Sequence, residues 1–139
     1  MLSLLDLERH SVADWFVVFR DLPDIAERSW PWRLLKSGFR HVEVWRCDRG
    51  IWLRVDPCME LIEVEAHEAP PWELISKALN PTCVHVVRSV KHQKVREPFF
   101  FGPWTCVELT KAFIGIRAPF VRTPHQLYKR LKKEMVMRA

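Results

Sequence analysis

The sequence is poor in glycine and lacks the short motifs that mark most nucleotide-binding enzymes. Only 4 of its 139 residues are Gly, and none of them forms a P-loop or a Gly-rich dinucleotide fingerprint. The cysteines have no C-x-x-C spacing, and no pair of ligand doublets has structural-zinc spacing. Cys83 and His85 share one strand face, but we interpret Cys83, like Cys47 and Cys58, as a packing residue. We therefore expect no cofactor and no metal.

Long apolar runs are missing as well. The run near the start, residues 15–19, is far too short to cross a bilayer. Residues 1–6 lack the basic region and the long apolar segment of a signal peptide. We therefore expect a protein without a transmembrane segment or a signal peptide, whose cysteines are reduced.

Acidic residues are outnumbered, with Lys+Arg 22 against Asp+Glu 17 and a net charge of +5. Much of this excess lies in residues 129–138, so the rest of the chain is nearly neutral. Thr123, followed by Pro and by apolar residues one helical turn apart, predicts a basic helix over about residues 124–135. Its charged side is either a solvated face or a docking surface for an assembly partner or an anionic polymer. We expect no specific nucleic-acid partner.

Aromatic residues are abundant, with 7 Trp and 8 Phe in a chain of one-domain length, residues 1–139. Its 10 prolines divide it into short elements. Period-two patterns predict strands, and capping signals predict helices. The predicted strands are residues 15–19, 41–46, 51–56, 61–65 and 83–88, and a short helix is predicted for 71–79. We expect an α+β fold with a small antiparallel sheet packed against a helix.

The clearest hairpin joins the strands on either side of residues 47–50. We centre its turn on Asp48 and Arg49. One face then carries chemically matched pairs, and the other face is apolar and faces the core. The expected cross-strand pairs are His41 with Asp56, Glu43 with Arg54, and Trp45 with Trp52.

A helix begins at Thr105, which forms a capping box with Glu108, and ends near Gly115. Cys106 is its first residue, where free amides and the helix dipole favour a thiolate. An imidazole on a strand, oriented by a carboxylate, completes the arrangement of Cys–His catalysis. The sequence therefore predicts a catalytic set of Cys106, His41 and Asp56.

Each of these residues also has a simpler interpretation. Cys106 on its own is more often an inert small residue at a helix start. His41 is equally a partly solvated residue at a strand end, and Asp56 before Pro57 is a common way to leave a strand. The conjunction of the three favours the catalytic interpretation.

Several tryptophans are candidates for a substrate groove beside this site. Trp45 and Trp52 are expected to share the polar face of the hairpin, and Trp104 leads directly into Cys106. We therefore place Trp45, Trp52 and Trp104 in the groove. The alternative, which we favour for the loop aromatics, is packing in the core.

Residues 14–19 and 38–45, a polar residue that ends the next strand, and Cys106 at a helix start resemble the circularly permuted papain-like superfamily, which includes the NlpC-type cell-wall peptidases and relatives of lecithin retinol acyltransferase. Residues 38–41, 56–57, 106–108 and 123–128 also resemble small proteins of tailed bacteriophages. The similarity covers about residues 12–131.

The resemblance implies a papain-like fold in which the His strand precedes the Cys helix. It implies that Cys106 is the nucleophile, His41 the general base and Asp56 the orienting residue. The implied function is hydrolysis of an amide, in peptide crosslinks of the bacterial cell wall, by a phage-encoded protein in the virion or the host cytoplasm. The alternatives are a non-enzymatic tail or neck component that contacts other virion proteins, and acyl transfer to or from a lipid.

Overall fold

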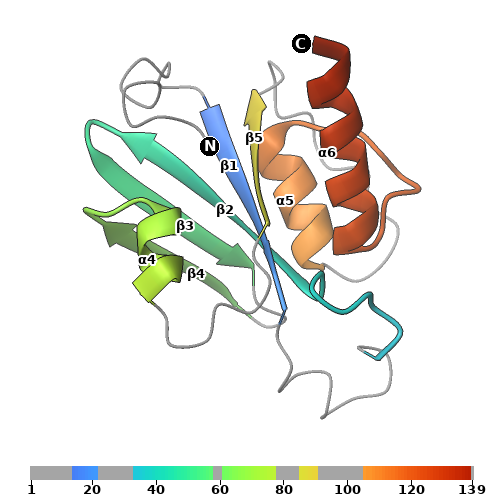
Figure 1. The fold of residues 1–139 in the computed structure, drawn as a ribbon, viewed down its shortest axis with the longest axis horizontal. Helices are drawn as coiled ribbons and strands as arrows, with labels where there is room; N and C mark the ends of the chain where they lie inside the picture. Colours follow the sequence, from blue (N-terminus) through green and yellow to red (C-terminus); the bar gives the residue numbers. More distant parts are fainter. Residues whose placement is uncertain (1–13, 22–32, 58–60, 78–84, 91–104, 139) are drawn as a thin grey trace.

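The structure, a computed structural model, has an α+β fold built around one five-stranded antiparallel sheet with strand order β4-β3-β2-β1-β5 (Figure 1). It describes residues 14–21, 33–57, 61–77, 85–90 and 105–138. None of the helices in these ranges has the length and apolar character needed to cross a membrane. The strands are β1 (Asp14–Arg20), β2 (His41–Asp48), β3 (Ile51–Pro57), β4 (Ile62–His67) and β5 (His85–Val90).

All five predicted strands are present, with ends within a few residues of those expected. Strand β1 lies between β2 and β5 and is buried along residues 15–19, because its side chains belong alternately to the two core clusters on opposite faces of the sheet. Its near-continuous apolar sequence suits a strand that is covered on both faces. The pairing of β1 with β2 places Arg20 directly beside His41.

The predicted hairpin between β2 and β3 is correct, but its predicted register is wrong: each residue of β2 pairs two positions further along β3 than expected. The turn is centred on Arg49 and Gly50, which have φ angles of 49° and 82°. A two-residue turn with both central residues in this region matches the twist of a hairpin, and glycine adopts it at no steric cost. The observed pairs include Val44 with Val55, Trp45 with Arg54 and Cys47 with Trp52.

The register error leaves every side chain on its expected face, because the shift moves the pairing by an even number of positions. Val44 and Val55 still face one side of the sheet, and Trp45 and Trp52 face the other. His41 and Asp56 therefore approach each other diagonally rather than as direct cross-strand partners.

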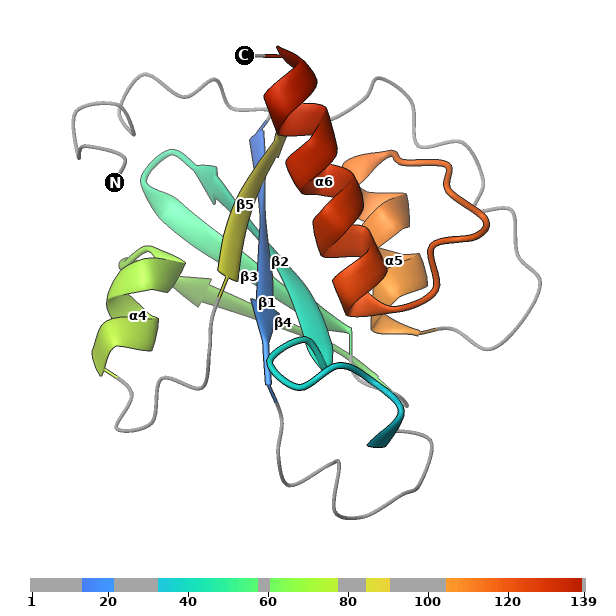
Figure 2. The same cartoon turned by 45° about the vertical axis from the view of Figure 1, so that its right-hand side comes forward.

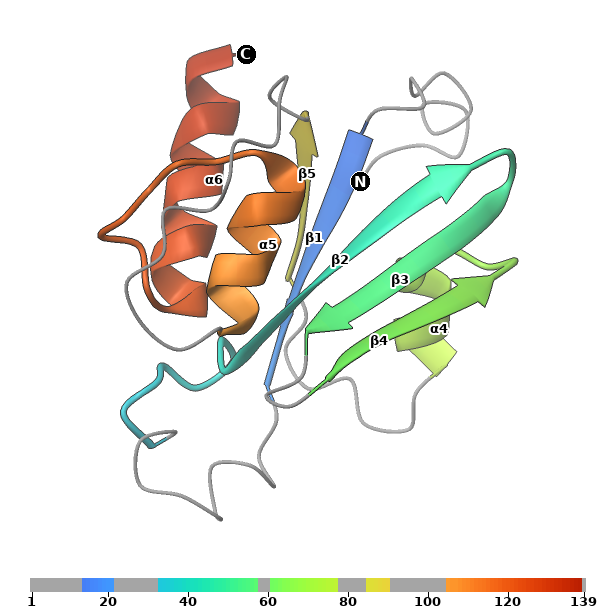
Figure 3. The same ribbon diagram turned by 180° about the vertical axis from the view of Figure 1, so that it is seen from behind.

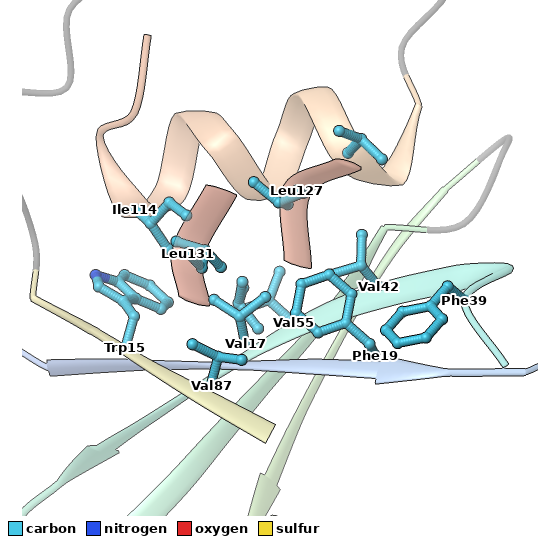
Figure 4. Packing of buried hydrophobic residues seen from close by; sticks show 12 residues of the cluster. Trp15, Val17, Phe19, Phe39, Val42, Val55, Val87, Ile114, Leu127 and Leu131 are labelled. Carbon is cyan, nitrogen blue, oxygen red and sulfur yellow. The ribbon is translucent and has the colours of Figure 1, made fainter. Parts of the chain in front are cut away.

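Helices cover the two faces of the sheet unequally. Helices α5 (Cys106–Ile114) and α6 (Pro124–Arg138) lie together on one face, and the short α4 (Pro71–Lys77) lies on the other (Figure 2). The main core fills the space between α5, α6 and the sheet (Figure 4). A smaller aromatic cluster of Phe16, Trp45 and Trp52 packs against Trp72 of α4.

The helix that carries Cys106 begins and ends where the sequence predicts. The Thr105 hydroxyl accepts a hydrogen bond from the Glu108 amide at 3.3 Å, and Gly115 ends the helix with a φ of 74°. The Glu108 carboxylate does not complete the capping box, because it accepts a hydrogen bond from the Lys111 ammonium instead. The basic helix predicted over about residues 124–135 is also confirmed, and it continues to Arg138.

A buried lysine ties α5 to the segment that leads into α6. The Lys111 ammonium donates to Glu108 Oε1 at 2.7 Å and to the carbonyl oxygens of Ala118 and Val121 at 2.9 and 2.8 Å. All three of its protons are therefore used. This connection fixes α5, and with it the position of Cys106, against the rest of the helical layer.

We expect Lys111→Met to destabilise the protein by about 3 kcal/mol, because it leaves a carboxylate and two carbonyls without their donor. Chemical denaturation measures this change. The matched control is Lys132→Met on the exposed side of α6, which should change stability by less than about 0.5 kcal/mol. Equal effects of the two substitutions would contradict the role given to Lys111.

Candidate active site

The three residues expected to form a catalytic set lie at one end of the sheet. His41 is the first residue of β2, Asp56 lies next to the last residue of β3, and Cys106 is the first residue of α5. The start of α5 lies beside the start of β2 and the end of β3 (Figure 3). Antiparallel pairing and the direction of α5 therefore bring together residues that are far apart in the sequence.

His41 and Asp56 are joined by a short, buried hydrogen bond. His41 Nε2 lies 2.5 Å from Asp56 Oδ1, and the two side chains are only 9% and 4% exposed. A carboxylate that accepts from one ring nitrogen fixes the tautomer and the direction of the imidazole. Because Nε2 faces Asp56, Nδ1 is the nitrogen left to face the thiol.

Cys106 contacts the same imidazole. The thiol is half-buried and packs against the main core cluster at the start of α5. Burial of the His41 ring disfavours its charged form, but hydrogen bonds to Asp56 and Cys106 and the negative charges of both outweigh this and raise the pKa of His41 to about 9. The imidazole is therefore protonated at neutral pH.

Asp56 stays ionised although it is buried. Burial alone would raise the pKa of its carboxyl, but the hydrogen bond and charge of His41, with the charges of Arg54 and Arg20, hold the pKa well below its usual range. Asp56 Oδ2 accepts from Arg20 Nη2 at 3.0 Å and also from Arg54 Nη2. Each oxygen of the carboxylate thus has its own partners.

The geometry next to His41 also bears on metal binding. Donor atoms of His41, Glu43 and Asp56 lie within 4.8 Å of one another, as close as metal ligands do. However, Arg20 and Arg54 bind the two carboxylates, and these guanidiniums would repel a divalent cation. The donor set therefore does not suit a metal ion.

Two of the three tryptophans assigned to a substrate groove, Trp45 and Trp52, lie away from Cys106. Trp45 and Trp52 are 3% and 8% exposed and belong to the aromatic cluster beneath α4, on the opposite face of the sheet from α5. They are packing residues there because the hairpin turns their side of the sheet towards Trp72. Trp104 lies outside the described residues, as do Cys58 and Cys83.

Sequence reasoning missed two residues that contact the site. Arg20 follows the apolar run of β1, and only the pairing of β1 with β2 shows that it lies beside His41. Glu43 was assigned to Arg54 alone, but its Oε2 also lies 3.0 Å from Arg20 Nη2. The sequence shows that Arg20 is a charged residue directly after a buried strand, but this pattern does not specify which residue Arg20 contacts.

Comparison with known proteins identifies no relative of this chain. No protein-family model matches the chain, and no curated protein or solved structure matches it significantly. The geometry of the described residues therefore carries the functional argument.

We expect the ring signals of His41 to titrate with a pKa of about 9 in an NMR pH titration. In Asp56→Asn the pKa should fall towards the ordinary value of about 6.5, because the neutral amide no longer favours the imidazolium. The control is Asp48→Asn at the exposed end of the hairpin, which should leave the titration unchanged. A wild-type pKa near 6.5 would show that the three groups do not interact as described.

The same pKa predicts how stability depends on pH. The pKa of His41 is raised on folding from about 6.5 to about 9. Its contribution to stability is therefore complete below about pH 6.5 and is lost as the pH rises towards 9. The difference in unfolding free energy between wild type and His41→Gln should shrink by up to about 3 kcal/mol over this range, measured by urea denaturation. A difference that stays constant with pH would contradict the prediction.

Proposed function

We propose that the protein is a thiol hydrolase that cleaves an amide through a covalent acyl-enzyme. The observation that carries this proposal is the contact of one buried imidazole with both a carboxylate and a thiol at a helix start. Cys106 is the nucleophile, His41 moves the proton, and Asp56 orients the ring. Nucleophilic catalysis by cysteine needs this set of three roles.

The proposed reaction starts from a Cys106 thiolate beside the imidazolium of His41. The Cys106 thiolate attacks the carbonyl carbon, and we assign stabilisation of the negative charge on the oxygen to the Cys106 amide at the start of α5. The C–N bond then breaks, and imidazolium His41 gives its proton to the leaving amine. In the second half, His41 takes a proton from water as the water attacks the thioester, and the C–S bond breaks to restore the thiolate.

The energetics of burial support a functional role for these charges. Taking an imidazolium and several carboxylates out of water costs more than an apolar replacement would, so such groups are weak evidence for stability alone. Residues with strongly perturbed pKa values next to a nucleophile are typical of active sites. His41 and Asp56 both meet this description, and Cys106 supplies the nucleophile.

For the substrate, we propose peptide crosslinks of the bacterial cell wall. This part of the proposal rests on the short stretches that resemble NlpC-type peptidases and phage proteins, around His41, Asp56 and Cys106. The papain-like arrangement, with the His strand before the Cys helix, is proposed on the same ground. The order of β2 and α5 along the chain is compatible with it.

A non-enzymatic virion component is the second candidate, and the exposed side of α6 favours it. Lys129, Lys132 and Lys133 lie on that side, and Val136 and Met137 are 75% and 68% exposed. A basic, partly apolar helix side suits a partner surface. The reactivity of Cys106 separates the two candidates, because a purely structural component does not need it.

We expect the wild-type protein to release amino groups from purified peptidoglycan and to acquire an acetyl group on Cys106 from p-nitrophenyl acetate. Both activities should fall by about 10³-fold or more in Cys106→Ala, which removes the nucleophile. The control is Cys47→Ala, which removes a second half-buried free thiol and should leave both activities unchanged. Amine release and intact-protein mass spectrometry measure the two reactions.

The two assays test separate parts of the proposal. Acetylation of Cys106 without release of amino groups would contradict the cell-wall substrate but leave the thiol chemistry standing. A Cys106 that acquires no acetyl group would contradict the hydrolase itself and favour the virion component.

A further inference from the structure

A chain of hydrogen bonds leads away from the proposed catalytic set into the sheet. Asp56 Oδ2 accepts from Nη2 of both Arg20 and Arg54. The same two Nη2 atoms lie 3.0 and 2.8 Å from Glu43 Oε2. The other oxygen of Glu43 accepts from the buried indole of Trp45 at 2.9 Å.

Apart from Arg20, whose side chain is 29% exposed, the members of this chain are shielded from water. The Glu43 and Asp56 side chains are 3% and 4% exposed, and the Arg54 side chain is 14% exposed. Two guanidiniums face two buried carboxylates, so the set is electrically balanced without any help from His41 or Cys106. Arg54 Nη1 also bonds Glu65 Oε2 at 2.7 Å, at the more exposed rim on β4.

A carboxylate has a broad, two-fold torsion and does not choose its own direction. Bonds to Oδ2 hold the Asp56 carboxylate in the orientation that presents Oδ1 to His41. Arg54 can do so with directional bonds because its planar fork engages Glu43 through both Nε and Nη2, at 3.2 and 2.8 Å, while Nη2 also reaches Asp56. Glu43 in turn is held by Trp45.

We propose that Arg54, supported by Arg20 and anchored through Glu43 to the indole of Trp45, is a positioning residue that fixes the Asp56 carboxylate towards His41. The inference rests on the proposed function, in which the orientation of His41 matters for the thiol. Arg54 acts through Asp56 and has no contact with the reacting atoms in this role.

Charge balance and positioning, the two possible roles of Arg54, predict opposite changes in the pKa of His41 when Arg54 is removed. If Arg54 only balances charge, its removal takes a cation away from the imidazolium and raises the pKa of His41. If Arg54 positions Asp56, its removal frees the carboxylate to turn, weakens the hydrogen bond to Nε2 and lowers the pKa of His41. The sign of the change therefore separates positioning from charge balance.

The experiment is an NMR titration of His41 in Arg54→Gln, with the signal assigned by its loss in His41→Gln. We expect the pKa of His41 to fall from about 9 towards 6.5, and acetylation of Cys106 at neutral pH to slow by about 100-fold, as misorientation of a catalytic group does. Arg54→Lys keeps the charge but not the fork, and it should restore part of both losses.

The matched control is Arg130→Gln, which removes an exposed guanidinium paired with Glu134 on α6; it should leave both readouts unchanged. If Arg54→Gln does not fold, Trp45→Phe removes the indole donor that anchors Glu43 without changing any charge, and it should lower the pKa of His41. An unchanged or higher pKa in the folded variant overturns the positioning role.

These outcomes are distinct from a failure of the proposed function, because the titration needs no substrate. A wild-type protein in which His41 titrates near 9 but Cys106 acquires no acetyl group contradicts the hydrolase alone. An active wild-type protein with an unaltered His41 titration in Arg54→Gln contradicts only the positioning of Asp56.

Discussion

The hydrogen bond between His41 and Asp56 depends on the place where β2 begins and β3 ends. The hairpin brings these two ends together, and the pairing of β1 with β2 adds Arg20 to the same end. Helix α5 begins beside these two strand ends. Packing of α5 against the sheet fixes the position of the helix, and Lys111 ties it to the following segment. One end of the sheet thus collects an imidazole, two buried carboxylates, two guanidiniums and a thiol.

This concentration of charge is costly for a small domain and needs complete pairing. Each buried carboxylate oxygen that accepts a bond offsets part of the desolvation, and the two arginines supply most of the donors. The apolar clusters on the two faces of the sheet carry the stability instead. Apolar side chains pack against the middle of the sheet, while one end of the sheet holds the ionisable groups.

Much of this arrangement was predictable from local patterns. Alternation along residues 41–56 predicted both strands and the two faces, and the capping signals at Thr105 and Gly115 predicted the helix that carries Cys106. The pairing of His41 with Asp56 was also expected, although from a register that is wrong. It survives because long side chains reach diagonal neighbours on the same face. A turn centred on Arg49 and Gly50, where glycine readily adopts a positive φ angle, would have predicted the correct register.

Other features depend on long-range packing, which local patterns do not contain. Trp45 and Trp52 alternate like exposed residues of a polar face, but α4 covers that face and buries them. Arg20 contacts Asp56 only because β1 lies beside β2 in the middle of the sheet, and nothing in the sequence around Arg20 specifies this neighbour. The role of Glu43 as a link between Trp45 and the two arginines has the same origin.

The most direct test of the central claim, that Cys106 and His41 form an ion pair, is the rate of alkylation of Cys106 by iodoacetamide as a function of pH. Mass spectrometry locates the adduct in the wild type and in His41→Ala. The ion pair predicts fast alkylation that persists well below pH 8 in the wild type and shifts to higher pH in His41→Ala. A folded wild-type protein in which Cys106 is inert, or in which it titrates like a free thiol whether or not His41 is present, would contradict the account.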